Sequence, residues 1–155
     1  MAIKYIIGNA TEPQGDGNKF IVHICNNIGA WGAGFVLALS GKWPQPEEEY
    51  KSKHSLILGN VQLVQVSTDI YVVNMIAQEG IRSKDERYPN NTIPPIRYNS
   101  LEKCLDKVKT LALVSKASIH MPRIGTGLAG GNWDIIKQII ENSLSDLDIC
   151  VYDLK

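Results

Sequence analysis

Apolar residues follow two different spacings along this chain, and each spacing predicts one kind of element. Continuous apolar runs bounded by polar or glycine residues are typical of strands buried on both faces. Helical spacing instead repeats every three or four residues. The expected strands cover residues 3–7, 20–25, 61–67, 70–77, 118–124 and 149–154. The expected helices cover residues 33–41, 44–52 and 101–114, with a last helix whose apolar face is Ile135, Ile136, Ile139, Ile140 and Leu144.

Local residue choice predicts how several of these elements begin and turn. Thr68 and Asp69 separate two strand runs and predict a tight hairpin. Asn99 or Ser100 is expected to cap the third helix, because both side chains can accept from a helix amide. Acidic residues in the first turn of segment 44–52 suit the helix dipole.

Helices alternate with strands, and this order predicts the architecture. We expect a three-layer α/β/α sandwich with a central mixed sheet, in a single domain spanning residues 1–155. In such sheets ligands bind beyond the carboxyl ends of the strands, where loops lead into helices.

Composition narrows the setting without naming a function. The chain is 44% hydrophobic and 21% charged, and its 16 basic and 16 acidic residues cancel. No net field favours nucleic acid or a membrane, and no apolar run is long enough to span one. Three distant cysteines, Cys25, Cys104 and Cys150, predict reduced thiols in a cytoplasmic protein. Nothing in the spacing predicts a metal or a cofactor.

Three segments rich in glycine or asparagine follow predicted strands. The first is GNAT, residues 8–11. Asn9 can close a local turn through its side chain or meet a ligand, and turn preferences favour the local role.

The second segment, HICNNIGAWGAGF, covers residues 23–35. Its glycines precede a helix, whose first amides would face an anionic group. We call residues 29–35 the first glycine loop. Trp31 within it could cover a pocket or simply pack against the helix, and the sequence does not separate these roles.

The third segment, MPRIGTGLAGGNW, covers residues 121–133. Residues 124–131 are here called the second glycine loop. Gly125, Gly127, Gly130 and Gly131 would free its backbone to take positive φ and approach a ligand. The segment lacks the GK[ST] of a phosphate loop and matches the dinucleotide fingerprint poorly. Two such loops together could hold the two phosphates of a diphosphate.

These three motifs, in this order, resemble the macrodomain family over the whole chain. Within this family the chain most resembles the compact branch, which includes terminal ADP-ribose protein glycohydrolase and ADP-ribose 1″-phosphate phosphatases. The shared features are MPRIG-x-GL, a following NW and the closing VYDL. The resemblance implies an α/β/α sandwich that binds ADP-ribose at the strand ends. The expected ligand is ADP-ribose or its 1″-phosphate, and an ADP-ribosylated protein is a further expected partner. By the same resemblance, the residues that contact the ligand are Gly8, Asn9, Ala10, Asn26, Asn27, Gly29, Ala30, Trp31, Gly32, Ala33, Gly34, Phe35, Ile124, Gly125, Thr126, Gly127, Leu128, Ala129, Gly130, Tyr152 and Leu154.

Matching by motif gives several of these residues separate roles. Asn9 stands where the family has an Asp that contacts the adenine amino group, and its carbonyl could still accept that bond. Tyr152 and Leu154 would border the adenine. Asn26 and Asn27 match asparagines beside the distal ribose, and Asn74 and Gln78, on the adjoining strand, are placed to meet it as well.

The residues that carry catalysis in the glycohydrolases are missing. Those enzymes use a Lys after the central hairpin strand and an Asp in the second loop. Here the strand continues as NMIAQEG without a Lys, and Ala129 occupies the Asp position. The first loop has no acidic residue, so protein de-ADP-ribosylation is not carried over.

A phosphatase would need another acid or base. His23 is the candidate, because an unperturbed imidazole titrates near neutral pH, although a core histidine is the commoner role. Cys25 fits the core better than a nucleophile. The charged segment 79–98 could be a flap that brings Arg82, Lys84, Arg87 and Arg97 to a terminal phosphate, or a solvated loop.

Two functions therefore stay open on the sequence. One is the processing of ADP-ribose 1″-phosphate or a related ligand, which we favour because the chain is compact and carries His23. The other is a reader module that binds ADP-ribose without turnover. Binding of another nucleotide or a nucleic-acid end, suggested by Asn9 alone, is the weakest.

Overall fold

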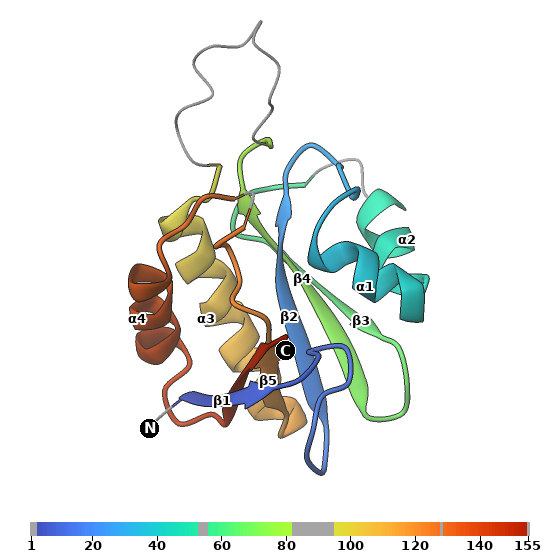
Figure 1. The fold of residues 1–155 in the computed structure, drawn as a ribbon, viewed down its shortest axis with the longest axis vertical. Helices are drawn as coiled ribbons and strands as arrows, with labels where there is room; N and C mark the ends of the chain where they lie inside the picture. The colour runs from blue at the N-terminus through green and yellow to red at the C-terminus, as the bar shows by residue number, and fades with distance from the viewer. Residues whose placement is uncertain (1–2, 53–55, 82–94, 128, 155) are drawn as a thin grey trace, which may run out of the picture.

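A computed structural model of the chain describes residues 3–52, 56–81, 95–127 and 129–154 (Figure 1). Four helices and six strands are found in these ranges. In chain order they are β1 (Ile3–Ile7), β2 (Lys19–Asn26), α1 (Phe35–Lys42), α2 (Gln45–Ser52), β3 (Val61–Gln65), β4 (Ile70–Gln78), α3 (Tyr98–Ser115), β5 (Ser118–Met121), α4 (Trp133–Ser143) and β6 (Ile149–Asp153).

The strands form one mixed sheet in the order β1-β6-β5-β2-β4-β3. Every neighbouring pair is parallel except the β3–β4 hairpin. The predicted turn at Thr68 and Asp69 joins that hairpin, which confirms the expectation.

Helices cover both faces of the sheet, which confirms the predicted three-layer arrangement. Helices α3 and α4 lie on one face and α1 and α2 on the other (Figure 1). One buried cluster joins Phe20 and Val22 of β2 to Leu105 of α3 and Ile136 of α4, and the other joins Ile21 to Leu39 of α1 and Tyr50 of α2. Strand β2 alternates between the two cores, and this explains its continuous apolar run.

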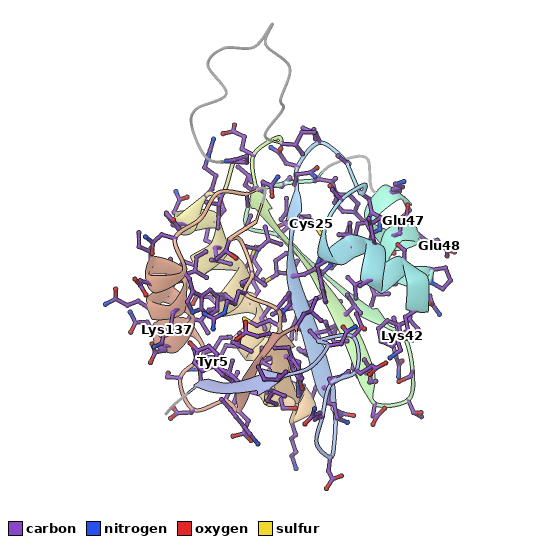
Figure 2. All side chains as sticks on the ribbon, in the orientation of Figure 1. Tyr5, Cys25, Lys42, Glu47, Glu48 and Lys137 are labelled. Atoms are coloured by element: carbon purple, nitrogen blue, oxygen red, sulfur yellow. The ribbon has the colours of Figure 1, made fainter. Side chains whose placement is uncertain are left out.

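Side chains on the outer helices reflect the same layering (Figure 2). Lys42, Glu47 and Glu48 lie on the outer side of α1 and α2, and Lys137 on the outer side of α4, whereas Cys25 lies within the molecule on β2. Burial raises the pKa of the Cys25 thiol well above its usual range, so the thiol stays protonated at neutral pH.

Two predicted boundaries differ from the structure more than the others do. Strand β5 ends at Met121, because Pro122 has no amide to donate to a neighbouring strand. Helix α3 begins at Tyr98 with Arg97 in the cap position and no side-chain cap, so neither Asn99 nor Ser100 caps it. Its first turn is instead fixed by tertiary contacts, among them the Arg97 amide bond to the Ala77 carbonyl at 2.8 Å.

Parallel pairing gathers the predicted ligand segments at one edge of the sheet. The carboxyl ends of β1, β6, β5, β2 and β4 point the same way. The GNAT segment, both glycine loops, Gln78 and Leu154 therefore meet at that edge. In the described ranges, no helix has the length and apolar character needed to cross a bilayer.

Candidate ligand cleft

Three adjoining cavities run along the carboxyl edge of the sheet and share lining residues. The outer cavity, about 360 Å³, is lined by Gly8, Asn9, Ala10, Gly34, Phe35, Ala38, Pro122, Tyr152 and Leu154. The central cavity, about 330 Å³, is lined by His23, Ile24, Ala33, Gly34, Phe35, Val36, Gln78, Pro122, Arg123, Ile124, Gly125, Thr126, Gly127 and Ala129. The inner cavity, about 260 Å³, is lined by Ile24, Cys25, Asn26, Ala30, Trp31, Gly32, Ala33, Val36, Gln78 and Ile81. Together they form one elongated cleft.

Asn9 closes a local turn at the outer cavity. Its Oδ1 accepts from the Thr11 amide at 2.9 Å and from the Thr11 hydroxyl at 2.8 Å. Both lone pairs of that oxygen are therefore used within the protein. This is the local role that turn preferences favoured, and contact of the Asn9 carbonyl with a ligand stays a prediction.

Tyr152 is fixed at the wall of the outer cavity by a buried hydrogen-bond chain. Its hydroxyl accepts from the Gln14 amide at 2.8 Å and donates to Nδ1 of His120, also at 2.8 Å, because the Ser118 hydroxyl donates to the Asn18 carbonyl and so leaves Nε2 as the ring donor. The other imidazole nitrogen then donates to the Ser118 hydroxyl at 2.7 Å. Burial lowers the pKa of His120 to about 4, which keeps the ring neutral at pH 7.

The first glycine loop is held by the side chain of Asn26. Its Oδ1 accepts from the amides of Ile28 and Ala30 at 3.1 and 3.0 Å and from the Tyr50 hydroxyl at 2.7 Å. Its Nδ2 donates to the Ala30 carbonyl at 2.7 Å. Asn26 lines the inner cavity, but most of its hydrogen-bonding capacity maintains the loop.

The first glycine loop ends with exposed amides at the start of α1. Gly34 takes φ 78° and ψ −143°, a conformation that glycine adopts without a Cβ penalty. The amides of Phe35 and Val36 have no hydrogen-bond acceptor among the described residues. Two unpaired amides at a helix N-terminus are an electropositive site for an anion.

The second glycine loop is shaped by close packing. A Cβ on Gly125 would lie 2.6 Å from Ile96 Cδ1, and one on Gly131 would lie 2.6 Å from the Gly125 carbonyl oxygen. Only Gly125 and Gly130 of its four glycines have positive φ. The prediction that all four glycines take positive φ was therefore wrong for Gly127 and Gly131.

Gly127 is the open position of the second glycine loop. A Cβ there would meet no atom within 4 Å. The amides of Gly125, Thr126 and Gly127 make no hydrogen bond to another described residue. This loop thus faces the first across the central cavity with a second set of unpaired amides.

His23 does not have the properties expected of a catalytic base. It reaches the floor of the central cavity but is 3% exposed, and its ring packs against Trp31 and Phe35. Its Nε2 donates to Oδ1 of Asn74. Burial lowers the pKa of His23 to about 4, so the expectation of titration near neutral pH was wrong.

Asn74 is a structural residue rather than a ligand contact. It is fully buried in the middle of β4, and its Nδ2 donates to the Pro46 carbonyl and to Oε1 of Gln62, both at 3.0 Å. The sequence placed it with Gln78 at the end of the strand, but it lies four residues before that end, with its side chain in the interior. Gln78, at the true end of β4, lines both the central and inner cavities.

Trp31 packs as a core residue whose edge lines the inner cavity. It is 7% exposed, its Nε1 donates to the Ser40 hydroxyl at 2.7 Å, and its ring lies 5.3 Å from that of Tyr50. The structure thus favours packing over a lid.

The remaining predicted residues lie beside the cleft. Asn27, Gly29 and Gly130 do not line any of the three cavities, and Asn27 Oδ1 instead accepts from the Gly80 amide at 2.9 Å. Leu128 and residues 82–94, which carry Arg82, Lys84 and Arg87, lie outside the described residues.

Sequence reasoning missed several lining residues, of which Arg123 matters most. Its guanidinium donates to both carboxylate oxygens of Asp153 at 2.7 and 2.9 Å and lies 5.0 and 5.3 Å from the rings of Tyr5 and Trp133. A basic residue directly before a glycine-rich loop was the available signal. The others are Ile24, Cys25, Val36, Ala38, Ile81 and Pro122.

The cleft has binding groups but lacks a ready acid or base. None of the described residues lining the three cavities is Asp or Glu. His23 stays neutral, Cys25 stays protonated and Arg123 is paired with Asp153. The arrangement is suited to an elongated ligand with a central anionic group.

Comparison with solved structures gives close matches over the full chain. A protein of unknown function from Bacteroides thetaiotaomicron is 49% identical with a TM-score of 0.91, and the match covers 99% of each chain. A macrodomain protein from Streptomyces coelicolor is 39% identical with a TM-score of 0.82, covering 98% of this chain and 99% of that one. A Trypanosoma brucei macrodomain in complex with ADP-ribose is 20% identical with a TM-score of 0.68, covering 98% and 63%.

Comparison with curated proteins gives more distant relatives. Chromodomain-helicase-DNA-binding protein 1-like from Danio rerio is 32% identical over 93% of this chain, which spans only 14% of that protein's length. The Mus musculus protein of the same name is 30% identical over 97% of this chain, which spans 17% of its length. The ADP-ribose 1″-phosphate phosphatase of Lodderomyces elongisporus is 25% identical, covering 98% of both chains. No family model matches the chain.

Proposed function

The chain belongs to the macrodomain family, and we propose that it binds ADP-ribose or a close derivative in the cleft at the carboxyl edge of its sheet. The observation that carries the proposal is the pair of facing loops with unpaired amides. Phe35 and Val36 supply one set, and residues 125–127 supply the other. Main-chain amides of this kind bind phosphate without a cation.

The order of the cavities suits the parts of such a ligand. The outer cavity, with the rings of Phe35 and Tyr152, would take the nucleoside. The central cavity between the loops would take the diphosphate. The inner cavity, with Asn26 and Gln78 at its wall, would take the distal ribose. Complexes of the related Trypanosoma brucei macrodomain contain ADP-ribose, which supports the ligand class.

Binding without turnover fits the described residues best. Hydrolysis of a phosphate or glycosidic bond needs a group that can transfer a proton near neutral pH. Burial removes His23 from that range, and no carboxylate among the described residues lines the cleft. The sequence argument had favoured processing because of His23, so its burial reverses that preference.

Release of phosphate from ADP-ribose 1″-phosphate is the second candidate. It is favoured by 25% identity to a fungal phosphatase over 98% of both chains. Phosphorus NMR of ADP-ribose 1″-phosphate with stoichiometric protein separates the two functions. Shifted diphosphate signals without inorganic phosphate are expected, whereas growth of an inorganic phosphate signal would make the protein an enzyme.

The position of the diphosphate can be tested at Gly127. Its φ is not positive and a Cβ there meets no atom within 4 Å, so a side chain is accommodated without strain. Gly127→Glu places a carboxylate beside the diphosphate, and Gly127→Gln is the matched neutral control. By calorimetry, ADP-ribose should bind the Glu variant at least about tenfold more weakly than the Gln variant. Equal affinities in two folded variants would contradict this placement of the phosphates.

A further inference from the structure

Arg123 lies between the end of β5 and the second glycine loop, and its side chain contacts three other elements. The guanidinium donates through Nε and Nη2 to the two carboxylate oxygens of Asp153, at the end of β6, at 2.7 and 2.9 Å. Its central carbon lies 5.0 Å from the ring of Tyr5 on β1 and 5.3 Å from that of Trp133 at the start of α4. Trp133 Nε1 in turn donates to the Tyr5 hydroxyl at 3.4 Å. These four side chains are here called the arginine cluster.

The arginine cluster fixes geometry more than it adds stability. The side chains of Arg123 and Asp153 are 40% and 32% exposed. Exposed ion pairs typically contribute less than about 1 kcal/mol to folding, because water and salt screen them. Two N–H···O bonds to one carboxylate nevertheless set the direction of the planar guanidinium, and contact with two aromatic rings restricts it further.

The main chain of Arg123 holds the second glycine loop. The Thr126 hydroxyl donates to the Arg123 carbonyl at 2.8 Å and so closes the first turn of that loop. Thr126 lies between Gly125 and Gly127, whose amides make no hydrogen bond to another described residue. Because Thr126 is bonded to Arg123, the anchored position of Arg123 determines where these amides lie.

Asp153 supports the nucleoside end of the cleft. Its carbonyl accepts from the Gly8 amide at 2.9 Å, at the start of the GNAT segment that lines the outer cavity. Its chain neighbours Tyr152 and Leu154 line the same cavity. Asp153 therefore holds the outer cavity through its main chain and the second glycine loop through its side chain.

We infer that the Arg123–Asp153 pair sets the position of the second glycine loop relative to the outer cavity, and so favours ligands that span both. The inference rests on the proposed function, since it concerns the same cleft. Arg123 is a positioning residue here, because Asp153 already neutralises its charge and engages two of its nitrogens. A ligand that spans two sites gains its full affinity only when both sites fit it at once, whereas a ligand confined to one site does not depend on their spacing.

Asp153→Asn separates positioning from simple electrostatics. Asn keeps the size of the side chain and one acceptor oxygen, but it cannot form the bidentate pair. The change also removes a negative charge near the diphosphate, so electrostatics alone would raise the affinity for ADP-ribose. Positioning predicts the opposite sign. In calorimetric titration of the full chain, ADP-ribose should bind Asp153→Asn about tenfold more weakly than the wild-type protein, as expected when a phosphate contact is lost. Equal or tighter binding would overturn the inference.

Arg123→Lys provides a second test at the other partner. Lys keeps the positive charge but lacks the planar fork that pairs with both oxygens of a carboxylate. ADP-ribose should again bind about tenfold more weakly. Wild-type affinity in this variant would show that only the charge at position 123 matters, which would overturn the positioning role.

Adenosine tests whether the loss belongs to ligands that span the cleft. It carries no phosphate and would occupy the outer cavity alone. In NMR titrations its affinity for both variants should stay within about twofold of the wild-type value, because it does not depend on the spacing of the two sites. A loss as large as that for ADP-ribose would mean general damage to the pocket and would overturn the inference.

Asp69→Asn is the matched control for the change in charge. Asp69 pairs with Lys19 at 3.2 Å, at the amino ends of β2 and β4 and so at the opposite edge of the sheet. The affinity for ADP-ribose should stay within about twofold of the wild-type value, because salt screens a charge at that distance. A loss equal to that of Asp153→Asn would assign the effect to net charge and overturn the inference. If ADP-ribose does not bind the wild-type protein, the proposed function fails and the inference fails with it; wild-type binding that the variants leave unchanged defeats the inference alone.

Discussion

The two glycine loops have similar compositions, but different forces shape them. The first is held by hydrogen bonds from one buried side chain, Asn26, which is itself bonded to Tyr50. The second packs closely against apolar side chains, because a Cβ added at Gly125 or Gly131 would collide with Ile96 and Ile136. Glycine is therefore required in the second loop by lack of space and in the first at Gly34 by backbone conformation.

The difference teaches that a ligand loop can be preorganised by polar or by apolar support. Polar support depends on every partner being present, because a buried donor left unpaired is costly. Apolar support depends on shape, and an added methyl group is enough to disturb it. The predictions below perturb one kind of support at a time.

Asn26→Ala should have the largest effect on stability. It leaves the amides of Ile28 and Ala30 and the carbonyl of Ala30 without their partner, whereas the Tyr50 hydroxyl can still donate to the main-chain carbonyl of residue 26. With about 1–3 kcal/mol for each buried group left unpaired, the free energy of unfolding should fall by roughly 3–4 kcal/mol. Urea unfolding measures this. Tyr50→Phe, which removes one partner and leaves the loop amides satisfied, should cost about 1 kcal/mol, and equal losses in the two variants would contradict the central role of Asn26.

Lowering the pH should destabilise the protein through His23, the buried histidine beneath the first glycine loop. The pKa of His23 is lowered by burial to about 4 from 6.5, so the unfolded chain binds a proton that the folded protein does not. The contribution of His23 to the free energy of unfolding is fully present above about pH 6.5 and is lost as the pH falls toward 4. Below about pH 4 this contribution changes no further. The loss over this window is about 3 kcal/mol.

The measurement is the free energy of unfolding at several pH values between 7 and 4. His120, whose pKa is also lowered to about 4, contributes to the wild-type slope. His23→Gln removes one of the two groups and should reduce the slope by about half over this window. Identical slopes in the two proteins would mean that folding does not lower the pKa of His23.

Gly131→Ala should perturb the second loop by steric conflict. The new Cβ would lie 2.6 Å from a main-chain oxygen and 2.8 Å from Ile136 Cδ1, and the main-chain atom cannot swing aside. A loss of about 2–3 kcal/mol is expected from overpacking of this kind. Thermal or urea unfolding measures it, and a neutral result would show that the loop shifts freely.

Gly32→Ala is the matched change in the first loop and should have the smallest effect. Its φ is not positive and a Cβ there meets no atom within 4 Å. The free energy of unfolding should change by less than about 0.5 kcal/mol. A larger loss would show that the first loop is packed as tightly as the second, and the contrast between the loops would then disappear.

The sequence by itself determined the framework of this protein. Continuous apolar runs and helical spacing predicted all six strands, the four helices and the hairpin at Thr68 and Asp69, because burial on one face or two dictates the order of apolar residues. Strand ends followed by glycine and asparagine located the cleft, because parallel strands bring their carboxyl ends to one edge.

Only the tertiary structure decided which residues face the ligand and with which atoms. Asn74 and His23 are polar residues on strands that lead to the cleft, yet each satisfies the other inside the protein. Asn9 could offer an oxygen or a nitrogen, and Thr11 two residues later takes the oxygen. Gly127 and Gly131 are the same residue type, but one faces open space and the other a main-chain oxygen. These outcomes depend on which neighbours compete for each atom and each volume, and folding alone brings those neighbours together.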